Sequence, residues 1–169
     1  MVADPAPILL FAYGNISRGD DALAPLLVQR LLQHRTDRIC GHPVVYLSDF
    51  QIQVEHVLDM QGCACMILVD AHARQDAAFS FYRLRAQRDT HYTTHGMSPQ
   101  TLLYTYRQTL DADPPPSYML SLAGESFELG QDLSARASSN LELAFEFCQA
   151  LFSQDSLDYL DQAASTAPR

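Results

Sequence analysis

The sequence predicts an α/β protein of three layers, in which a mostly parallel five-stranded sheet carries helices on both faces. Short, continuous apolar runs alternate with longer amphipathic segments along the chain. This alternation is typical of parallel sheets whose strands are buried on both faces. The chain has 169 residues, of which 47% are hydrophobic, and this is enough for one domain with a substantial core. We find no internal repeat and no interior linker.

The expected strands are short segments bounded by Pro, Gly or Asp. Residues 7–14 and 65–71 are continuous apolar runs, as in buried strands, and residues 79–86 alternate as in an edge strand. The other two strands are expected at residues 43–49 and 117–124.

Four amphipathic segments predict helices, three of them between these strands and one after the last strand. The first, residues 21–34, carries leucine at every fourth position, and Pro25 is acceptable because it lies in the first turn. Asp20 or Asp21 is a natural N-cap for this helix, and both acids favour its positive end. The other helices are expected at residues 51–60, 98–110 and 133–152, the last two with Ser98 and Ser134 as N-caps.

Composition limits the classes of function. The net charge of −9 disfavours nucleic acid as a partner, and no apolar run approaches the roughly 20 residues of a membrane-spanning helix. The first residues lack the basic region of a secretory signal, and the four cysteines form no disulfide framework or CxxC pair. We therefore expect a cytoplasmic protein with one domain over residues 1–152 and a frayed polar tail over residues 153–169.

Acidic residues follow three of the expected strands. Asp20 and Asp21 come after the first strand, Asp49 ends the second, and Asp70 ends the third. Because the carboxyl ends of parallel strands meet at one edge of a sheet, these acids are expected on a common rim. Carboxylates that are crowded together repel one another, and a bound cation relieves that repulsion. The pattern therefore predicts a rim able to coordinate a metal.

A histidine near these acids favours a transition-metal ion at this rim, because imidazole is a good ligand for such ions. His95, in a polar loop before a helix, is one candidate, and spacing alone does not distinguish it from His91 or His72. The alternative interpretation is purely structural, with helix-capping acids after the first strand and Asp70 as a turn former. The HExxH, GxSxG, P-loop and GxGxxG patterns are absent from the sequence.

Four segments of the chain carry a resemblance to a known family. They are FAYGNISRGDDALAPLLVQRL, ILVDA, THGMSPQTLL and LAGESFELGQDLSARASSNLELAF. Together they resemble, in order and from Ile8 to about Leu151, the endopeptidases that mature the large subunit of NiFe hydrogenases. Tyr13 and Ala24 depart from the family's glycine-containing pattern, and Asp49 stands one residue later than the usual acid. The segment DFQIQVEH looks like the branch serving soluble, NAD-linked hydrogenases.

The resemblance implies an aspartic-type endopeptidase that removes a C-terminal peptide from a nickel-loaded precursor of the hydrogenase large subunit. The precursor supplies the nickel as the recognition feature, no permanently bound metal is expected, and the protease is expected to be a monomer. The implied metal-contacting residues are Asp21, Asp70 and His95, with Asp21 and Asp70 also catalytic. The implied substrate-binding residues are Asn15, Asp49 and His91.

Two other functions fit the residues. One is a non-catalytic metal- or small-ligand-binding module on a flavodoxin-like scaffold, which would bind metal tightly when isolated. The other is a metal-dependent hydrolase of small molecules, which is disfavoured because no basic phosphate-binding residues are evident.

Overall fold

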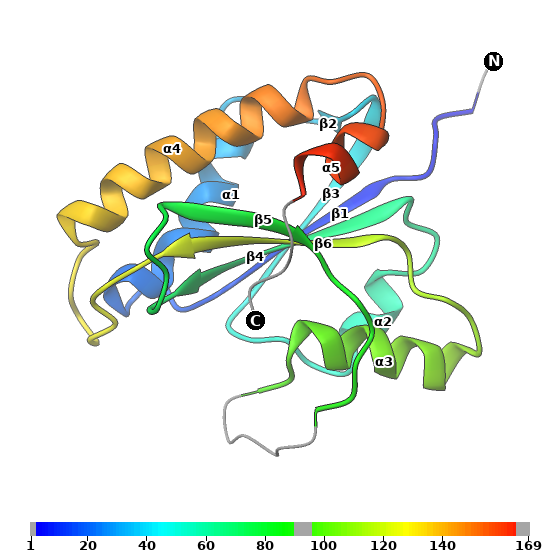
Figure 1. Cartoon of the computed structure of the whole chain (residues 1–169), viewed down its shortest axis with the longest axis horizontal. Coiled ribbons are helices and arrows are strands. Elements are labelled where there is room, and N and C mark those ends of the chain that lie inside the picture. The colour runs from blue at the N-terminus through cyan, green and yellow to red at the C-terminus, as the bar shows by residue number, and fades with distance from the viewer. Residues whose placement is uncertain (1–2, 90–95, 165–169) are drawn as a thin grey trace.

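A six-stranded sheet forms the centre of the protein in the computed structural model, which describes residues 3–89 and 96–164 (Figure 1). The strands lie in the order β2-β3-β1-β4-β6-β5. Their bounds are β1 (Ile8–Tyr13), β2 (Arg38–Ile39), β3 (His42–Asp49), β4 (Cys65–His72), β5 (Phe79–Arg83) and β6 (Ser117–Ala123). The four central strands are parallel, whereas β2 and β5 are antiparallel edge strands. The five expected strands are confirmed, and the sixth, β2, is only two residues long.

Helices cover both faces of the sheet, which confirms the three-layer α/β class. Figure 1 shows α1, α4 and α5 on one face and α2 and α3 on the other. Their bounds are α1 (Leu23–Gln33), α2 (His56–Asp59), α3 (Pro99–Leu110), α4 (Ala135–Phe152) and α5 (Asp158–Ala163), with a 3-10 helix at Gly19–Ala22. None of the helices within residues 3–89 and 96–164 combines the length and apolar character needed to cross a membrane.

The alternation of side chains along β1 divides the core in two. Ile8 and Leu10 pack with α1 and α4, whereas Leu9 and Phe11 pack with α2 and α3. Tyr13, at the end of β1, continues the second set and packs against the same cluster. The same alternation decides which face of the sheet a polar side chain at the end of a strand lies on.

The two serine N-caps expected from the sequence are confirmed. The Ser98 hydroxyl accepts a hydrogen bond from the Thr101 N–H at 3.1 Å, and Pro99 occupies the first position of α3. The Ser134 hydroxyl accepts a hydrogen bond from the Ala137 N–H at 3.0 Å at the start of α4.

The helix expected over residues 51–60 is wrong for its first half, because only α2 is helical there. The preceding segment is fixed by tertiary contacts instead. Ile52 is buried in the core, and the Gln53 N–H donates a hydrogen bond to His56 Nδ1 at 2.9 Å. Burial of Ile52 and His56 outweighs the local helical pattern.

The expectation of a frayed tail after residue 152 is also wrong for the described part, which forms α5. Leu160 is fully buried in the core beneath α4. Asp161 accepts a hydrogen bond from the Tyr118 hydroxyl at 2.8 Å and pairs with Arg83. This helix is held because one of its faces is apolar and because its acid has two partners on the sheet.

Candidate active site

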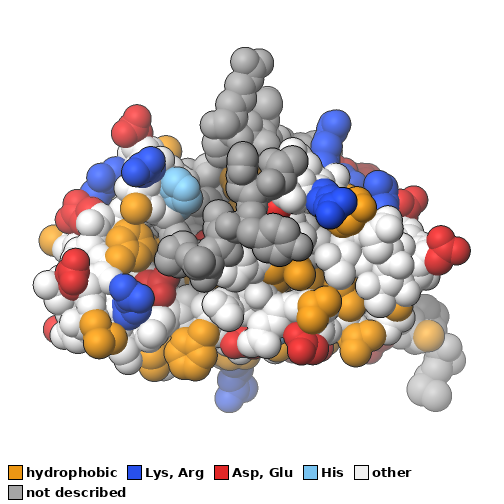
Figure 2. All heavy atoms as spheres, turned by 90° about the horizontal axis from the view of Figure 1, so that it is seen from below, with side chains coloured by type: hydrophobic (Ala, Val, Ile, Leu, Met, Phe, Trp, Pro, Cys, Tyr) orange, Lys and Arg blue, Asp and Glu red, His pale blue; other side chains and the backbone are white. Residues whose placement is uncertain are grey.

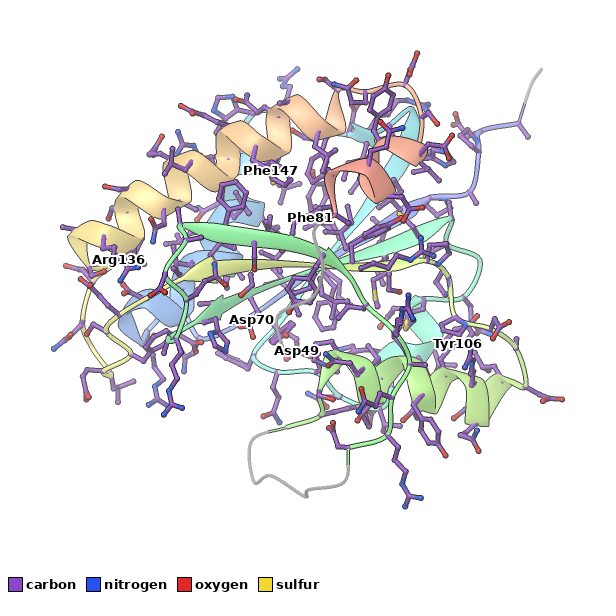
Figure 3. The ribbon with its side chains drawn as sticks, in the orientation of Figure 1. Asp49, Asp70, Phe81, Tyr106, Arg136 and Phe147 are labelled. Carbon is purple, nitrogen blue, oxygen red and sulfur yellow. The ribbon has the colours of Figure 1, made fainter. Side chains whose placement is uncertain are left out.

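Three polar side chains lie in a row where neighbouring strands end. In the register of β1 with β3, Tyr13 lies beside Asp49, and Asp70 follows Val69 on β4, the strand on the other side of β1. Each comes two residues after a side chain that packs with α2 and α3, so all three belong to that face. Figure 3 shows Asp49 and Asp70 at the same edge of the sheet. The common rim predicted from the sequence therefore exists.

A cavity of about 1230 Å³ opens at this edge. Its lining includes Asp21, Asp70, Arg18, Arg74, His72 and Gly96. Gly96 directly follows His95 in the sequence, whereas His95 and His91 themselves lie outside the described residues. The structure thus brings together Asp21 and Asp70 in one cavity, and the chain reaches the same cavity immediately after His95.

Asp70 has an unusual protonation behaviour for a carboxyl group. Burial raises its pKa to about 7, and the nearby charge of Asp21 acts in the same direction. Two hydrogen bonds oppose this rise, one from the Ala71 N–H at 2.7 Å and one from the Tyr13 hydroxyl. Burial and the charge of Asp70 together hold the pKa of Tyr13 well above its ordinary value, so Tyr13 stays a donor. At neutral pH, Asp70 is therefore able both to accept and to release a proton.

Asp21 is positioned by the turn that follows β1. Its Oδ2 accepts a hydrogen bond from the Asn15 N–H at 2.8 Å. Gly14 has a φ of +150°, and a Cβ atom built there would lie 2.2 Å from the Asp21 carbonyl oxygen. Only glycine allows this close approach. The side chain of Asn15 serves the turn itself, because its Oδ1 accepts a hydrogen bond from the Ser17 N–H at 2.9 Å.

Asp20 does not cap α1, which corrects the expectation for this residue. The side chain is fully buried and faces the loop between β6 and α4. It accepts hydrogen bonds from the N–H groups of Glu125, Ser126 and Ser134 at 2.7–3.0 Å and from the Ser134 hydroxyl at 2.8 Å. Burial alone would raise the pKa of Asp20, but these hydrogen bonds hold it below its ordinary value. Asp20 is an ionised anchor for that loop.

Asp49 lies outside the lining of the large cavity and contributes to a smaller neighbouring one of about 210 Å³. Its Oδ1 accepts a hydrogen bond from the Phe50 N–H at 2.6 Å, and its Oδ2 lies 3.3 Å from His56 Nε2. His56 Nδ1 accepts the Gln53 N–H, so a neutral His56 carries its proton on Nε2, the nitrogen that faces Asp49. Asp49 thus shares the rim with Asp70 but lines a different cavity from Asp21 and Asp70, and its predicted role in substrate binding stays a prediction.

Metal ligation was the sequence-based hypothesis for this rim. Within the described part of the chain, no group of three His, Cys, Asp or Glu side chains is arranged to hold a metal ion. His72 lines the cavity, but its Nδ1 accepts the Arg74 N–H at 3.1 Å. The carboxylates of Asp21 and Asp70 are suitable donors for a cation that brings ligands of its own.

Three ionisable side chains of this cavity were not among the expected site residues: Tyr13, Arg18 and Arg74. The position of Tyr13 could have been predicted, because it continues the alternation of Leu9 and Phe11 and therefore lies on the same face of the sheet. Arg18 directly precedes the Gly-Asp-Asp segment, and Arg74 follows the strand that ends near Asp70. Neither arginine is an acid or a histidine at a strand end, so the pattern that predicted the rim does not include them.

No protein-family model and no curated protein matches this sequence. Solved structures do match. HycI, a NiFe hydrogenase maturation protease from Thermococcus kodakarensis, has 17% sequence identity and a TM-score of 0.65, covering 88% of this chain and 94% of that chain. HybD, a hydrogenase maturating endopeptidase from Escherichia coli, has 22% identity and a TM-score of 0.61, covering 85% and 90%. The chain therefore has the fold of the NiFe hydrogenase maturation proteases.

Proposed function

We propose that this protein is an endopeptidase that removes a C-terminal peptide from a nickel-loaded precursor of a NiFe hydrogenase large subunit. One observation carries the proposal. Asp21 and Asp70, the two acids that the family resemblance marks as metal-contacting, line one cavity in a chain with the fold of these proteases. The nickel belongs to the precursor and serves as the recognition feature, and the reaction takes place in the cytoplasm.

The third contact to the nickel comes from His95 in this proposal. The proposal is supported by Gly96, the next residue in the sequence, which lines the cavity with the two acids. Two carboxylates and one imidazole suit a divalent transition metal that keeps its other ligands on the precursor. Asp21 and Asp70 would hold the precursor with its C-terminal segment across the cavity.

Peptide hydrolysis requires activation of a water molecule. Asp70 is the group best suited to act as a general base, because its pKa of about 7 matches a neutral medium. The Tyr13 hydroxyl stabilises the ionised form of Asp70, and Asp21 opposes it. A metal in contact with the same water would lower its pKa and assist the step.

A processing assay tests this function. Purified protein is mixed with a hydrogenase large-subunit precursor, with and without inserted nickel, and mass spectrometry follows the loss of a C-terminal peptide. We expect nickel-dependent cleavage by the wild type and none by Asp21→Ala, Asp70→Ala or His95→Ala. Asp113→Ala is the matched control, because its side chain is 81% exposed and it precedes β6, away from the cavity.

Metal analysis of the isolated protein distinguishes the alternative function. A protease that meets its nickel on the precursor is expected to be purified without stoichiometric metal. Tight, stoichiometric metal together with failure to cleave any nickel-loaded precursor would favour a metal-binding module instead.

A further inference from the structure

Two arginines share the large cavity with Asp21 and Asp70. Arg18 lies in the turn after β1, and Arg74 lies in the loop after β4. The chain contains no lysine, so its side-chain cations are arginine and, when protonated, histidine. A guanidinium group stays charged at all relevant pH values and binds carboxylates through paired N–H donors.

Four of the other arginines in the described part of the chain are paired with acids. These pairs are Arg30 with Glu142, Arg38 with Asp4, Arg83 with Asp161 and Arg107 with Asp113. Arg18 and Arg74 form no ion pair among the described residues, and they are the arginines that line the same cavity as Asp21 and Asp70. Arg18 donates from Nε to the Phe127 carbonyl at 3.4 Å, a bond that leaves both terminal nitrogens of its guanidinium for another acceptor.

The acids of the cavity do not neutralise these arginines. Asp21 accepts the Asn15 N–H, and Asp70 accepts the Ala71 N–H and the Tyr13 hydroxyl. Both signs of charge therefore line one cavity without pairing across it. Figure 2 shows the same mixture on the lower face of the molecule, where arginine and acidic side chains are interspersed on both sides of the grey atoms. Such a lining suits a ligand that itself carries a cation and an anion at separate points.

We propose that Arg18 and Arg74 form a carboxylate-binding site that holds an acidic group of the C-terminal peptide while Asp21 and Asp70 face the metal of the precursor. This proposal rests on the proposed protease function and assigns it a substrate feature. The carboxylate comes either from an Asp or Glu side chain of the peptide or from its terminal carboxyl group. Both sources offer the same planar pair of oxygens to a guanidinium.

Cleavage kinetics test the site through Arg18→Gln and Arg74→Gln, which keep a long polar side chain and remove the charge. We expect each variant to raise KM about tenfold with kcat within about twofold of the wild type, because the charge contributes to binding in the ground and transition states alike. Added salt should raise KM for the wild type and have less effect on the double variant. Arg85→Gln is the matched control, because Arg85 is exposed and lines a separate cleft near Arg107 and the three prolines that precede β6.

Peptide binding provides a measurement that does not require cleavage. The probe is a synthetic copy of the C-terminal extension of the precursor, measured by calorimetry as the free acid, as the C-terminal amide, and with its Asp and Glu replaced by Asn and Gln. Loss of affinity for the amide identifies the terminal carboxyl group, and loss for the neutralised peptide identifies a side chain.

The proposal is overturned if the wild type does not bind the free-acid peptide, or if Arg18→Gln and Arg74→Gln keep wild-type KM and Kd. Those results leave the protease function intact when the wild type still cleaves the nickel-loaded precursor. Failure of the wild type to cleave, with arginine-dependent binding of the peptide preserved, contradicts the protease function alone.

Discussion

The raised pKa of Asp70 makes a quantitative prediction about stability. Asp70→Asn replaces the carboxyl group with an uncharged amide of nearly the same shape. An Asp whose pKa rises from 3.8 to about 7 on folding destabilises the folded protein above pH 7 by at most about 4 kcal/mol. Below pH 3.8 the group is protonated in both states and this cost vanishes. The wild type should therefore lose stability relative to Asp70→Asn as the pH rises from 3.8 to 7, with no further change above 7.

Urea unfolding followed by circular dichroism at pH 5 to 9 measures this difference. The free energy of unfolding of the wild type, minus that of Asp70→Asn, should fall by roughly 2.7 kcal/mol across this range, most of it below pH 7. Comparison with the variant removes the contributions of the other titrating groups. Asp113→Asn, at an exposed position, should show no such trend. A difference between wild type and Asp70→Asn that does not change with pH would refute the reasoning.

Tyr13→Phe extends the same experiment. Removing the hydroxyl deletes a hydrogen bond that favours the ionised form of Asp70. The pKa of Asp70 should therefore rise further, and the pH at which the stability difference levels off should move upward. An unchanged pH dependence would show that the Tyr13 hydroxyl does not act on Asp70.

Three more predictions follow from other contacts. Asp20→Asn should lower the free energy of unfolding at pH 7 by about 2–4 kcal/mol, because the buried carboxylate accepts four hydrogen bonds. The pKa of Asp20 is lowered on folding, so its contribution to stability is present above pH 3.8 and is lost as the pH falls. Unfolding measured over an acid titration should show this loss. Gly14→Ala should destabilise the protein by about 2 kcal/mol or more, because the new Cβ meets the Asp21 carbonyl, and it should abolish the proposed cleavage; an unchanged free energy of unfolding would contradict this. A thiol reagent should label only Cys63 in the folded protein, since the other three cysteines are buried; peptide mapping of the labelled sites is the check.

Five of the six strands were predictable because apolar runs and alternation are local patterns, whereas the two-residue β2 was not expected. The apolar runs that end at Tyr13 and near Asp70 place both residues at one edge, and strand alternation places them on one face. The serine caps of α3 and α4 were predictable for the same reason, because a cap bonds within three residues of itself.

The contacts that shape the cavity are not local, and the predictions that depended on local pattern alone were wrong there. Asp20 was expected to bond within its own turn, yet its partners lie 105 to 114 residues away. The region around Ile52 has a helical pattern, but burial of that side chain against the core decides its conformation. The link between Tyr13 and Asp70 joins two strands that are separated in sequence by α1, β2, β3 and α2. Only the register of the sheet reveals it.

The position of β6 has a consequence for the synthesis of this protein. β6 lies between β4 and β5 and follows both in the chain, so β5 has no neighbouring strand until residues 117–123 have been made. The carboxylate of Asp20 likewise lacks its partners until Ser134 has left the ribosome. A nascent chain that stops before these points has an exposed edge on β4 and an unanchored turn around Asp21. The sheet and the turn that carries Asp21 are therefore completed only late in translation, and until then the open edge of β4 is available for pairing with other chains.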